Sequence, residues 1–425
     1  FLNELEQASR SGAEREFAMV FDFAKKQQPG LTEIDLAARG YWYEQYRRSA
    51  FQFDSQEVRP YFPYSQVEPG ILRTAEKLFH VRFEQVKDAD VWHPSVTAWK
   101  VIDASGGANY GRQIGLFYLD MHPREGKDKW FSAASLAPGI RGRQYPEAAL
   151  ICNFPGGKDG DPGLMQYSDV VTYFHEFGHL MHAILGGDQQ WAGISGIRTE
   201  WDFVEAPSQM LEEFFRDPKL LASFARHYET GEVLPAETVQ RMNHASAFGR
   251  ADGIRTQLVY TSYSLDTHNT DPETIDLDAL LQSEYKRFSP YAWIEGNKMY
   301  ASFGHLVGYS SNYYTYLFDK AIALDFFAQF DREDLLEGPA AMRYRRAVLE
   351  PGGAKPAKEL VRDFLGRPQS MEPFKAWISE EFEDSQPTVH PRSGWAEASR
   401  KLAEAGDDLP DLTGFPNEDD KDLQW

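Results

Sequence analysis

Five residues near the middle of the chain place two imidazoles and a carboxylate at a spacing that suits catalysis with a metal ion. The run His175-Glu-Phe-Gly-His179 has the form H-E-x-x-H. Residues four apart lie on one face of an α-helix, so both imidazoles can reach one ion, and the adjacent glutamate, Glu176, can act as a general base. Two satisfied surface histidines are the alternative interpretation. Apolar residues at helical spacing before the motif favour an amphipathic helix, with Ser168 as its N-cap.

The two histidines require a further partner, because a catalytic zinc ion takes three protein ligands and keeps a fourth position for water. His182 follows His179 by three residues, but it lies about 10 Å along the helix axis from His175, too far to close one tetrahedron. The extended motif with a third histidine ten residues after the first also fails, because position 185 is leucine. We therefore expect a carboxylate from a later helix.

The segment 201–213 offers that carboxylate. Glu205, Gln209 and Glu212 share one face of a predicted helix, and apolar residues share the opposite face. Two helices with facing polar stripes would bring Glu205 to the two histidines. Asp202 and Glu212 remain alternatives for the ligand role, and either would otherwise orient an imidazole through a hydrogen bond.

A second group of polar aromatic residues follows His305. Tyr309, Tyr313 and Tyr316 are spaced i, i+4 and i+7, which predicts one face of a helix. On composition alone, such a stripe more often packs in a core than lines a site. The tyrosines therefore need further support before they become candidates for catalysis.

The elements around these residues predict a mostly helical α+β protein with a small antiparallel sheet. Helical spacing of apolar residues predominates over 1–95, and short β-like runs separated by glycines occupy 96–155. The metal-bearing helices are expected at 168–216, and a helical remainder at 217–380. The β-like run Ala148 to Phe154 is expected to be an edge strand that pairs with extended substrate.

Residues 1–380 are expected to form one catalytic unit. Residues 381–425 are acidic and rich in proline, which predicts an acidic C-terminal tail. The tail is the only feature that favours an alternative in which the chain is a non-catalytic interaction protein. Runs of charge are more often solvated surface, so we prefer the catalytic interpretation.

Composition limits the classes of partner. The 425 residues include 44 basic and 65 acidic side chains, a formal net charge of −21, which argues against nucleic acid and anionic membranes. No stretch approaches the roughly 18 consecutive apolar residues of a membrane span, because the best candidate, Tyr313 to Phe330, is interrupted by Asp319, Lys320 and Asp325. The single cysteine, Cys152, allows no intrachain disulfide and favours a reducing, cytoplasmic location. The chain begins at Phe1 without a Met, so a targeting segment outside this sequence remains an alternative.

Several motifs together resemble the thimet oligopeptidase family of zinc metallopeptidases. Besides the H-E-x-x-H run and the segment Asp202 to Glu212, they are Arg59-Pro-Tyr-Phe-Pro63, Gly115-Leu-Phe-Tyr-Leu-Asp120, Pro123-Arg-Glu-Gly126, Pro351-Gly-Gly353 and Phe364-Leu-Gly-Arg367. They occur in family order and extend over residues 1–380. The resemblance implies a zincin-like catalytic domain beside a deep substrate channel.

The resemblance also implies roles for individual residues and one Zn²⁺ per chain. The zinc ligands would be His175, His179 and Glu205, the catalytic residues Glu176, Tyr309, Tyr316 and His305, and the substrate-binding residues Tyr313 and Gly308. In this family, the tyrosine hydroxyls hydrogen-bond the tetrahedral intermediate across the cleft from zinc.

We therefore predict a monomeric zinc peptidase that hydrolyses internal bonds of short peptides. A peptidyl-dipeptidase that releases C-terminal dipeptides is the alternative within the same site, and an inactive peptide-binding relative is a further one. Family members are longer and carry a helical N-terminal region that helps wall the channel. The chain is thus expected to be the catalytic portion of a larger protein or a short relative.

Overall fold

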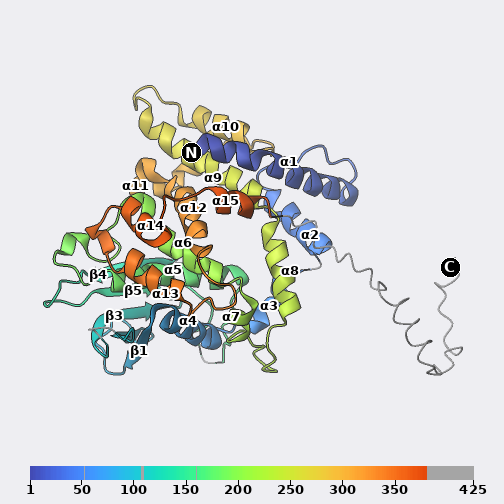
Figure 1. Ribbon diagram of the computed structural model, residues 1–425. Coiled ribbons are helices and arrows are strands. Elements are labelled where there is room, and N and C mark those ends of the chain that lie inside the picture. Colours follow the sequence, from blue (N-terminus) through green and yellow to red (C-terminus); the bar gives the residue numbers. More distant parts are fainter. Residues whose placement is uncertain (52, 107–109, 159, 381–425) are drawn as a thin grey trace, which may run out of the picture. The chain divides into compact units, whose positions relative to one another are not determined.

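Helices make up most of the computed structural model, which describes residues 1–51, 53–106, 110–158 and 160–380 (Figure 1). The α-helices are α1 (Leu2–Gln27), α2 (Arg39–Phe51), α3 (Ser55–Val58), α4 (Tyr64–Phe79), α5 (Tyr167–Leu185), α6 (Ala206–Phe214), α7 (Pro218–Ala222), α8 (Ala236–Ala247), α9 (Arg250–Asn269), α10 (Leu277–Phe288), α11 (His305–Gly308), α12 (Thr315–Phe327), α13 (Pro339–Tyr344), α14 (Ala357–Leu365) and α15 (Glu372–Ile378). The expected class, mostly helical with a small sheet, is confirmed. The predicted tail at 381–425 lies outside the described residues.

One five-stranded sheet lies among the helices, in the order β1-β2-β3-β5-β4. Its strands are β1 (Val81–Val86), β2 (Thr97–Asp103), β3 (Gln113–Asp120), β4 (Ser132–Ala137) and β5 (Glu147–Ile151). The expectation of a purely antiparallel sheet is wrong, because β3 and β5 pair in parallel while the other pairs are antiparallel. Alternation of apolar and polar residues identifies a strand but carries no information on its direction.

The sheet also begins earlier than the expected boundary at residue 96. The strand β1 follows α4 directly, and His80 between them has a φ of 50°. This left-handed residue ends the helix and turns the chain into the strand. The region 1–95 is therefore helical only as far as Phe79.

The expected edge strand is an interior strand. β5 lies between β3 and β4, and its residues Ala148, Ala149 and Leu150 are buried. A short continuous apolar run is typical of a strand covered on both faces, so the composition of this segment already favoured an interior position. The edges are formed by β1 and β4 instead, and Cys152 lies buried just after β5.

The helix α5 packs against the sheet through its apolar face. Phe177 is fully buried and contacts the rings of Phe83 on β1 and Phe117 on β3. The N-cap of α5 is Gln166 rather than Ser168, because Gln166 and Asp169 form a reciprocal capping box. The opposite face of α5 is left for the polar residues of the motif.

The helix α12 joins two hydrophobic clusters. One cluster includes the sheet, α5 and α6, and it takes Ile322, Ala323, Phe326 and Phe327 from α12. The other is built around α1 and α9, which lie side by side with α10 in Figure 1, and it takes Leu317, Ala321 and Leu324. Because α12 is packed on both sides, it is a rigid support for any side chain that it carries.

No helix in the described part of the chain combines the length and the apolar character needed to cross a membrane.

Candidate active site

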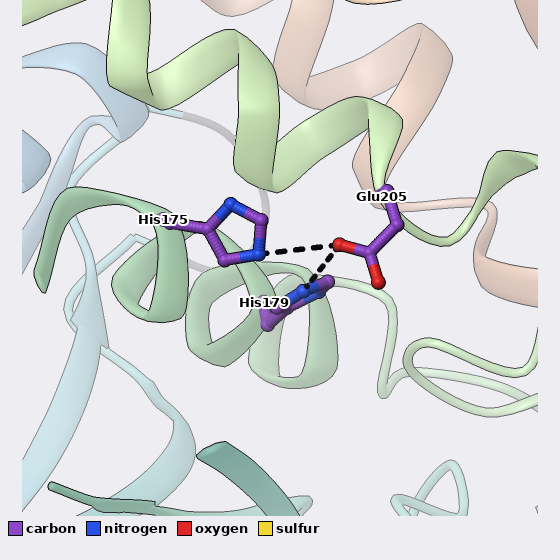
Figure 2. Close-up of side chains that lie close together, drawn as sticks. All are labelled: His175, His179 and Glu205. Atoms are coloured by element: carbon purple, nitrogen blue, oxygen red, sulfur yellow. Dashed lines mark hydrogen bonds and ion pairs between the residues drawn. The ribbon is translucent and has the colours of Figure 1, made fainter. Parts of the chain in front are cut away.

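Three donor atoms from two neighbouring segments converge on one point (Figure 2). His175 and His179 project from one face of α5, and Glu205 is the residue immediately before α6. Oε2 of Glu205 lies 3.2 Å from Nε2 of His175 and 3.0 Å from Nε2 of His179. One donor atom from each residue lies within 4.8 Å of the others. The structure thus brings together the three residues that the resemblance assigned to zinc.

The close contact between α5 and α6 depends on Gly178. A Cβ at this position would lie 2.7 Å from Cα of Ser208, so only glycine allows this approach. Ser208 donates from Oγ to Oε2 of Glu205 at 3.1 Å, and the backbone N–H of Glu205 donates to Oδ2 of Asp319 at 2.8 Å. Glu205 is therefore held through both its backbone and its side chain.

A second carboxylate, Glu212, orients His175. Oε1 of Glu212 lies 2.7 Å from Nδ1 of His175, which leaves Nε2 facing Glu205. Burial alone would raise the pKa of Glu212, but Lys320 and His175 lower it to about 2. Burial alone would lower the pKa of His175, but Glu205 and Glu212 raise it to about 10. A cation that binds His175 must displace a proton, so we expect acid to weaken metal binding.

Asp202, the other alternative ligand, lies outside the group of donor atoms. Its carboxylate accepts a hydrogen bond from Oη of Tyr314 at 2.7 Å. The expected helical face does not extend to it, because Trp201–Phe203 forms the short 3-10 helix η3 and Asp202 has a non-helical backbone. The polar face that includes Glu212 therefore begins at Glu205 and not at Asp202.

A cavity of about 610 Å³ opens over the donor atoms. Glu176 lines it beside the two histidines, and only 8% of this residue is exposed. His305, Tyr309 and Tyr316 also line it. The acid of the motif and the later aromatic group, more than a hundred residues apart in the sequence, therefore share one cavity.

The hydroxyl groups of the two tyrosines have different partners. Oη of Tyr309 donates to Oε1 of Glu205 at 2.8 Å, and Oη of Tyr316 lies 3.2 Å from Nε2 of His305. Burial, together with the charge of Glu205, raises the pKa of both tyrosines, so both are protonated donors at neutral pH. Burial lowers the pKa of His305, which favours a neutral imidazole.

The prediction that the three tyrosines lie on one face of a single helix is wrong. The chain is broken between α11 and α12 by the 3-10 helix η5 (Ser310–Asn312), and Ser310 has a φ of 43°. The ring of Tyr316 nevertheless contacts the rings of both Tyr309 and Tyr313. Tyr313 is buried against Phe303, and neither Tyr313 nor Gly308 is among the residues that line the cavity.

His182, excluded above as a ligand, is fully buried on α5 and not part of the donor group. Neither of its ring nitrogens has a hydrogen-bond partner among the described residues. Burial and the nearby His179 lower its pKa to about 3. This histidine is therefore neutral in the folded protein.

We expect His182→Leu to make the fold less sensitive to acid. The folded protein binds fewer protons at His182 than the unfolded chain does. The free energy of unfolding of the unmodified protein therefore has its full value above pH 6.5 and decreases as the pH falls from there towards 3. At pH 5 the loss is about 2 kcal/mol. Urea unfolding is measured at pH 8 and pH 5 with a chelator present. Relative to the unmodified chain, the free energy of unfolding of the variant should be higher at pH 5 than at pH 8 by this amount. An equal difference at both pH values would contradict the prediction.

The sequence did not reveal several residues that line the cavity. They come from the start of β4 and the two residues before it, and from the segment between α5 and α6: Trp130, Phe131, Ser132, Ala133, Ile197, Arg198, Thr199, Trp201 and Val204. The signal for β4 is weak, because Ser132–Ala137 contains no β-branched or aromatic residue. The loop residues carry no spacing that marks a site.

A helix that bears two histidines and a glutamate, a second glutamate just before the next α-helix and a cavity over them form an arrangement that is typical of metallopeptidases. The family model described as Peptidase family M3 matches residues 1–380. The chain therefore belongs to peptidase family M3.

Over the matched region, relatives in this family are about 30% identical to the chain. Oligopeptidase A of Escherichia coli (strain K12) is 30% identical over 387 residues, which cover 88% of this chain and 55% of that protein. Dipeptidyl carboxypeptidase of the same organism is 30% identical over 385 residues, with the same coverage. The mitochondrial intermediate peptidase of Arabidopsis thaliana is 31% identical over 380 residues, covering 86% of this chain and 52% of that protein. The chain thus spans about half the length of these relatives.

Proposed function

We propose that the chain is a zinc-dependent peptidase that hydrolyses internal bonds of short peptides. The observation that carries the proposal is that Glu176 lines the same cavity as three convergent donors from His175, His179 and Glu205. The activity, the metal and the substrate class are all part of the proposal. The names of the relatives, which include an oligopeptidase and a dipeptidyl carboxypeptidase, support peptides as the substrate class.

The donor set fits zinc. Two imidazole nitrogens and one carboxylate oxygen are the ligands of many catalytic zinc sites. Glu212 holds Nδ1 of His175, so Nε2 is the nitrogen left for the ion. When bound, zinc would polarise the peptide carbonyl and make water a stronger nucleophile at neutral pH.

The other residues of the cavity would move protons and bind the substrate. Glu176 would accept a proton from the attacking water and deliver it to the departing amine. Tyr316 would donate to the oxygen that becomes negative in the transition state, and Tyr309 would do so after its hydroxyl turns away from Oε1 of Glu205. The exposed edge of β4, where Ser132 and Ala133 line the cavity, would pair with the extended backbone of a peptide.

Removal of the metal tests the proposal. We expect the purified chain to hold about one zinc ion and to cleave a quenched fluorescent peptide. A strong chelator should abolish cleavage, and added zinc should restore it, because all three ligands belong to one site. Metal content and initial rate are measured on the same samples. Full activity in a sample that has lost its metal would contradict the proposal.

Release of C-terminal dipeptides is the second candidate function, and Arg198 favours it. Arg198 is the one lysine or arginine among the described residues that line the cavity. A guanidinium group here would bind a carboxylate by a charge-assisted hydrogen bond, as recognition of a peptide C-terminus requires. A peptidase that cuts internal bonds has no such requirement.

The products of a short peptide distinguish the two candidates. For the internal-bond peptidase we expect cleavage away from the ends, and equal rates for a peptide and its C-terminal amide. For the dipeptide-releasing enzyme, the amide would be a poor substrate, and Arg198→Gln would raise KM for the free acid about tenfold or more. Arg143→Gln, at an exposed arginine outside this cavity, is the matched control. Mass spectrometry of the products provides the measurement, and dipeptides as the sole products would contradict the first candidate.

A further inference from the structure

The glutamate that orients His175 is itself held by a buried lysine. Lys320 on α12 donates from Nζ to Oε2 of Glu212 at 3.1 Å, while Oε1 of the same carboxylate faces Nδ1 of His175 at 2.7 Å. Each oxygen of Glu212 thus has a partner of its own. Lys320 does not line the cavity, so it can influence the metal site only through the residues that it contacts.

The local charges explain why a cation is needed here. Glu212 and Glu213 are adjacent, and Nζ of Lys320 also lies 2.8 Å from Oε1 of Glu213. The side chains of Lys320 and Glu213 are only 11% and 4% exposed. Two neighbouring carboxylates with little access to water require a compensating positive charge. Arg216 pairs with the other oxygen of Glu213 at 3.0 Å, so Glu213 has a second cation, while Glu212 contacts Lys320 and the imidazole of His175.

Two consecutive residues of α12 support the metal ligands. Asp319 accepts the backbone N–H of Glu205, and Lys320 holds the carboxylate that contacts His175. The helix is packed into both hydrophobic clusters, so neither side chain can follow a movement of α5 or α6 without disturbing the core. This arrangement favours a fixed orientation of the imidazole.

We propose that Lys320 is a positioning residue for His175. Acting through Glu212, it fixes the orientation and the tautomer of the imidazole, and it thereby sets the affinity of the site for zinc. The inference rests on the proposed zinc site. A lysine that serves only to balance the charge of Glu213 would stabilise the fold and leave zinc affinity unchanged.

A double-mutant cycle on the full chain tests this inference, with the zinc dissociation constant as its readout. Lys320→Met removes the charge and keeps most of the side-chain length, and we expect it to weaken zinc binding about tenfold or more. In a Glu212→Gln background the same change should weaken binding by no more than about threefold, because the connection to His175 is already altered. Competition with a chromogenic chelator gives each constant.

Glu213→Gln is the matched control, because it removes the other carboxylate that contacts Lys320 and keeps the contact with Glu212. Zinc affinity should then stay within about threefold of the unmodified chain. With cobalt(II) in place of zinc, Lys320→Met should shift the d–d absorption bands, and Glu213→Gln should not. If Lys320→Met does not fold, Lys320→Gln keeps an N–H donor without the charge and allows the same comparison.

An unchanged dissociation constant in the Lys320 variant, or an equal loss in both backgrounds, would overturn the inference. Absence of zinc binding by the unmodified chain would instead overturn the proposed function.

Discussion

The Glu176→Gln protein is expected to keep its zinc and to lose peptide hydrolysis. Glu176 lines the cavity beside the two histidines but is not part of the group of donor atoms, so its replacement leaves the proposed zinc ligands in place. Glutamine has the same shape but cannot accept and deliver the proton of the attacking water. General-base catalysis contributes about 10²–10⁴-fold, and kcat should fall by this factor. Metal content and the rate on a quenched peptide provide the measurement.

Glu284→Gln is the matched control for this prediction. Glu284 is also a buried glutamate, but it lies on α10, away from the cavity. Burial raises its pKa to about 7, so a neutral amide resembles its protonated form, and activity should stay near that of the unmodified chain. A Glu176→Gln protein that retained a tenth or more of its kcat would refute the assignment of Glu176 as the base.

The group of donor atoms proposed to bind zinc was predictable because its main signal is local. His175 and His179 share a helical face whatever the rest of the chain does. The choice between Glu205 and its competitors was less local, since it depends on how α6 approaches α5. The structure places Glu205 in the donor group because Gly178 permits that approach and Asp319, more than a hundred residues later, fixes the backbone of Glu205.

The sheet was less predictable, since strand order and direction arise from pairing between segments far apart in the chain. The strand β4 lacks the residue types that mark strands, yet it occupies the edge that borders the cavity. The charged residues Asp319 and Lys320 interrupt an apolar helix, and in the sequence they only argued against a membrane span. Their supporting role depends on their partners, Glu205 for Asp319 and Glu212 for Lys320. The spacing of residues within α12 could not reveal those partners.

Tyr316→Phe is expected to lower kcat about 10²–10³-fold with little change in KM. The loss of one hydrogen-bond donor to a developing oxyanion typically has an effect of this size. The hydroxyl of Tyr316 faces the cavity next to His305, and its raised pKa keeps it protonated at neutral pH. Phenylalanine keeps the ring contacts with Tyr309 and Tyr313, so the wall of the cavity should keep its shape. Steady-state kinetics on one peptide separate the two constants.

Two other tyrosines make this prediction specific. Tyr314 lies two residues before Tyr316, but its hydroxyl donates to Asp202 and does not line the cavity, so Tyr314→Phe should keep kcat within about threefold. Tyr309→Phe removes the hydrogen bond to Oε1 of Glu205, so it should weaken zinc binding as well as lower kcat. If Tyr316→Phe raised KM and left kcat unchanged, Tyr316 would bind the substrate equally in its ground and transition states, and the oxyanion role would pass to Tyr309 alone.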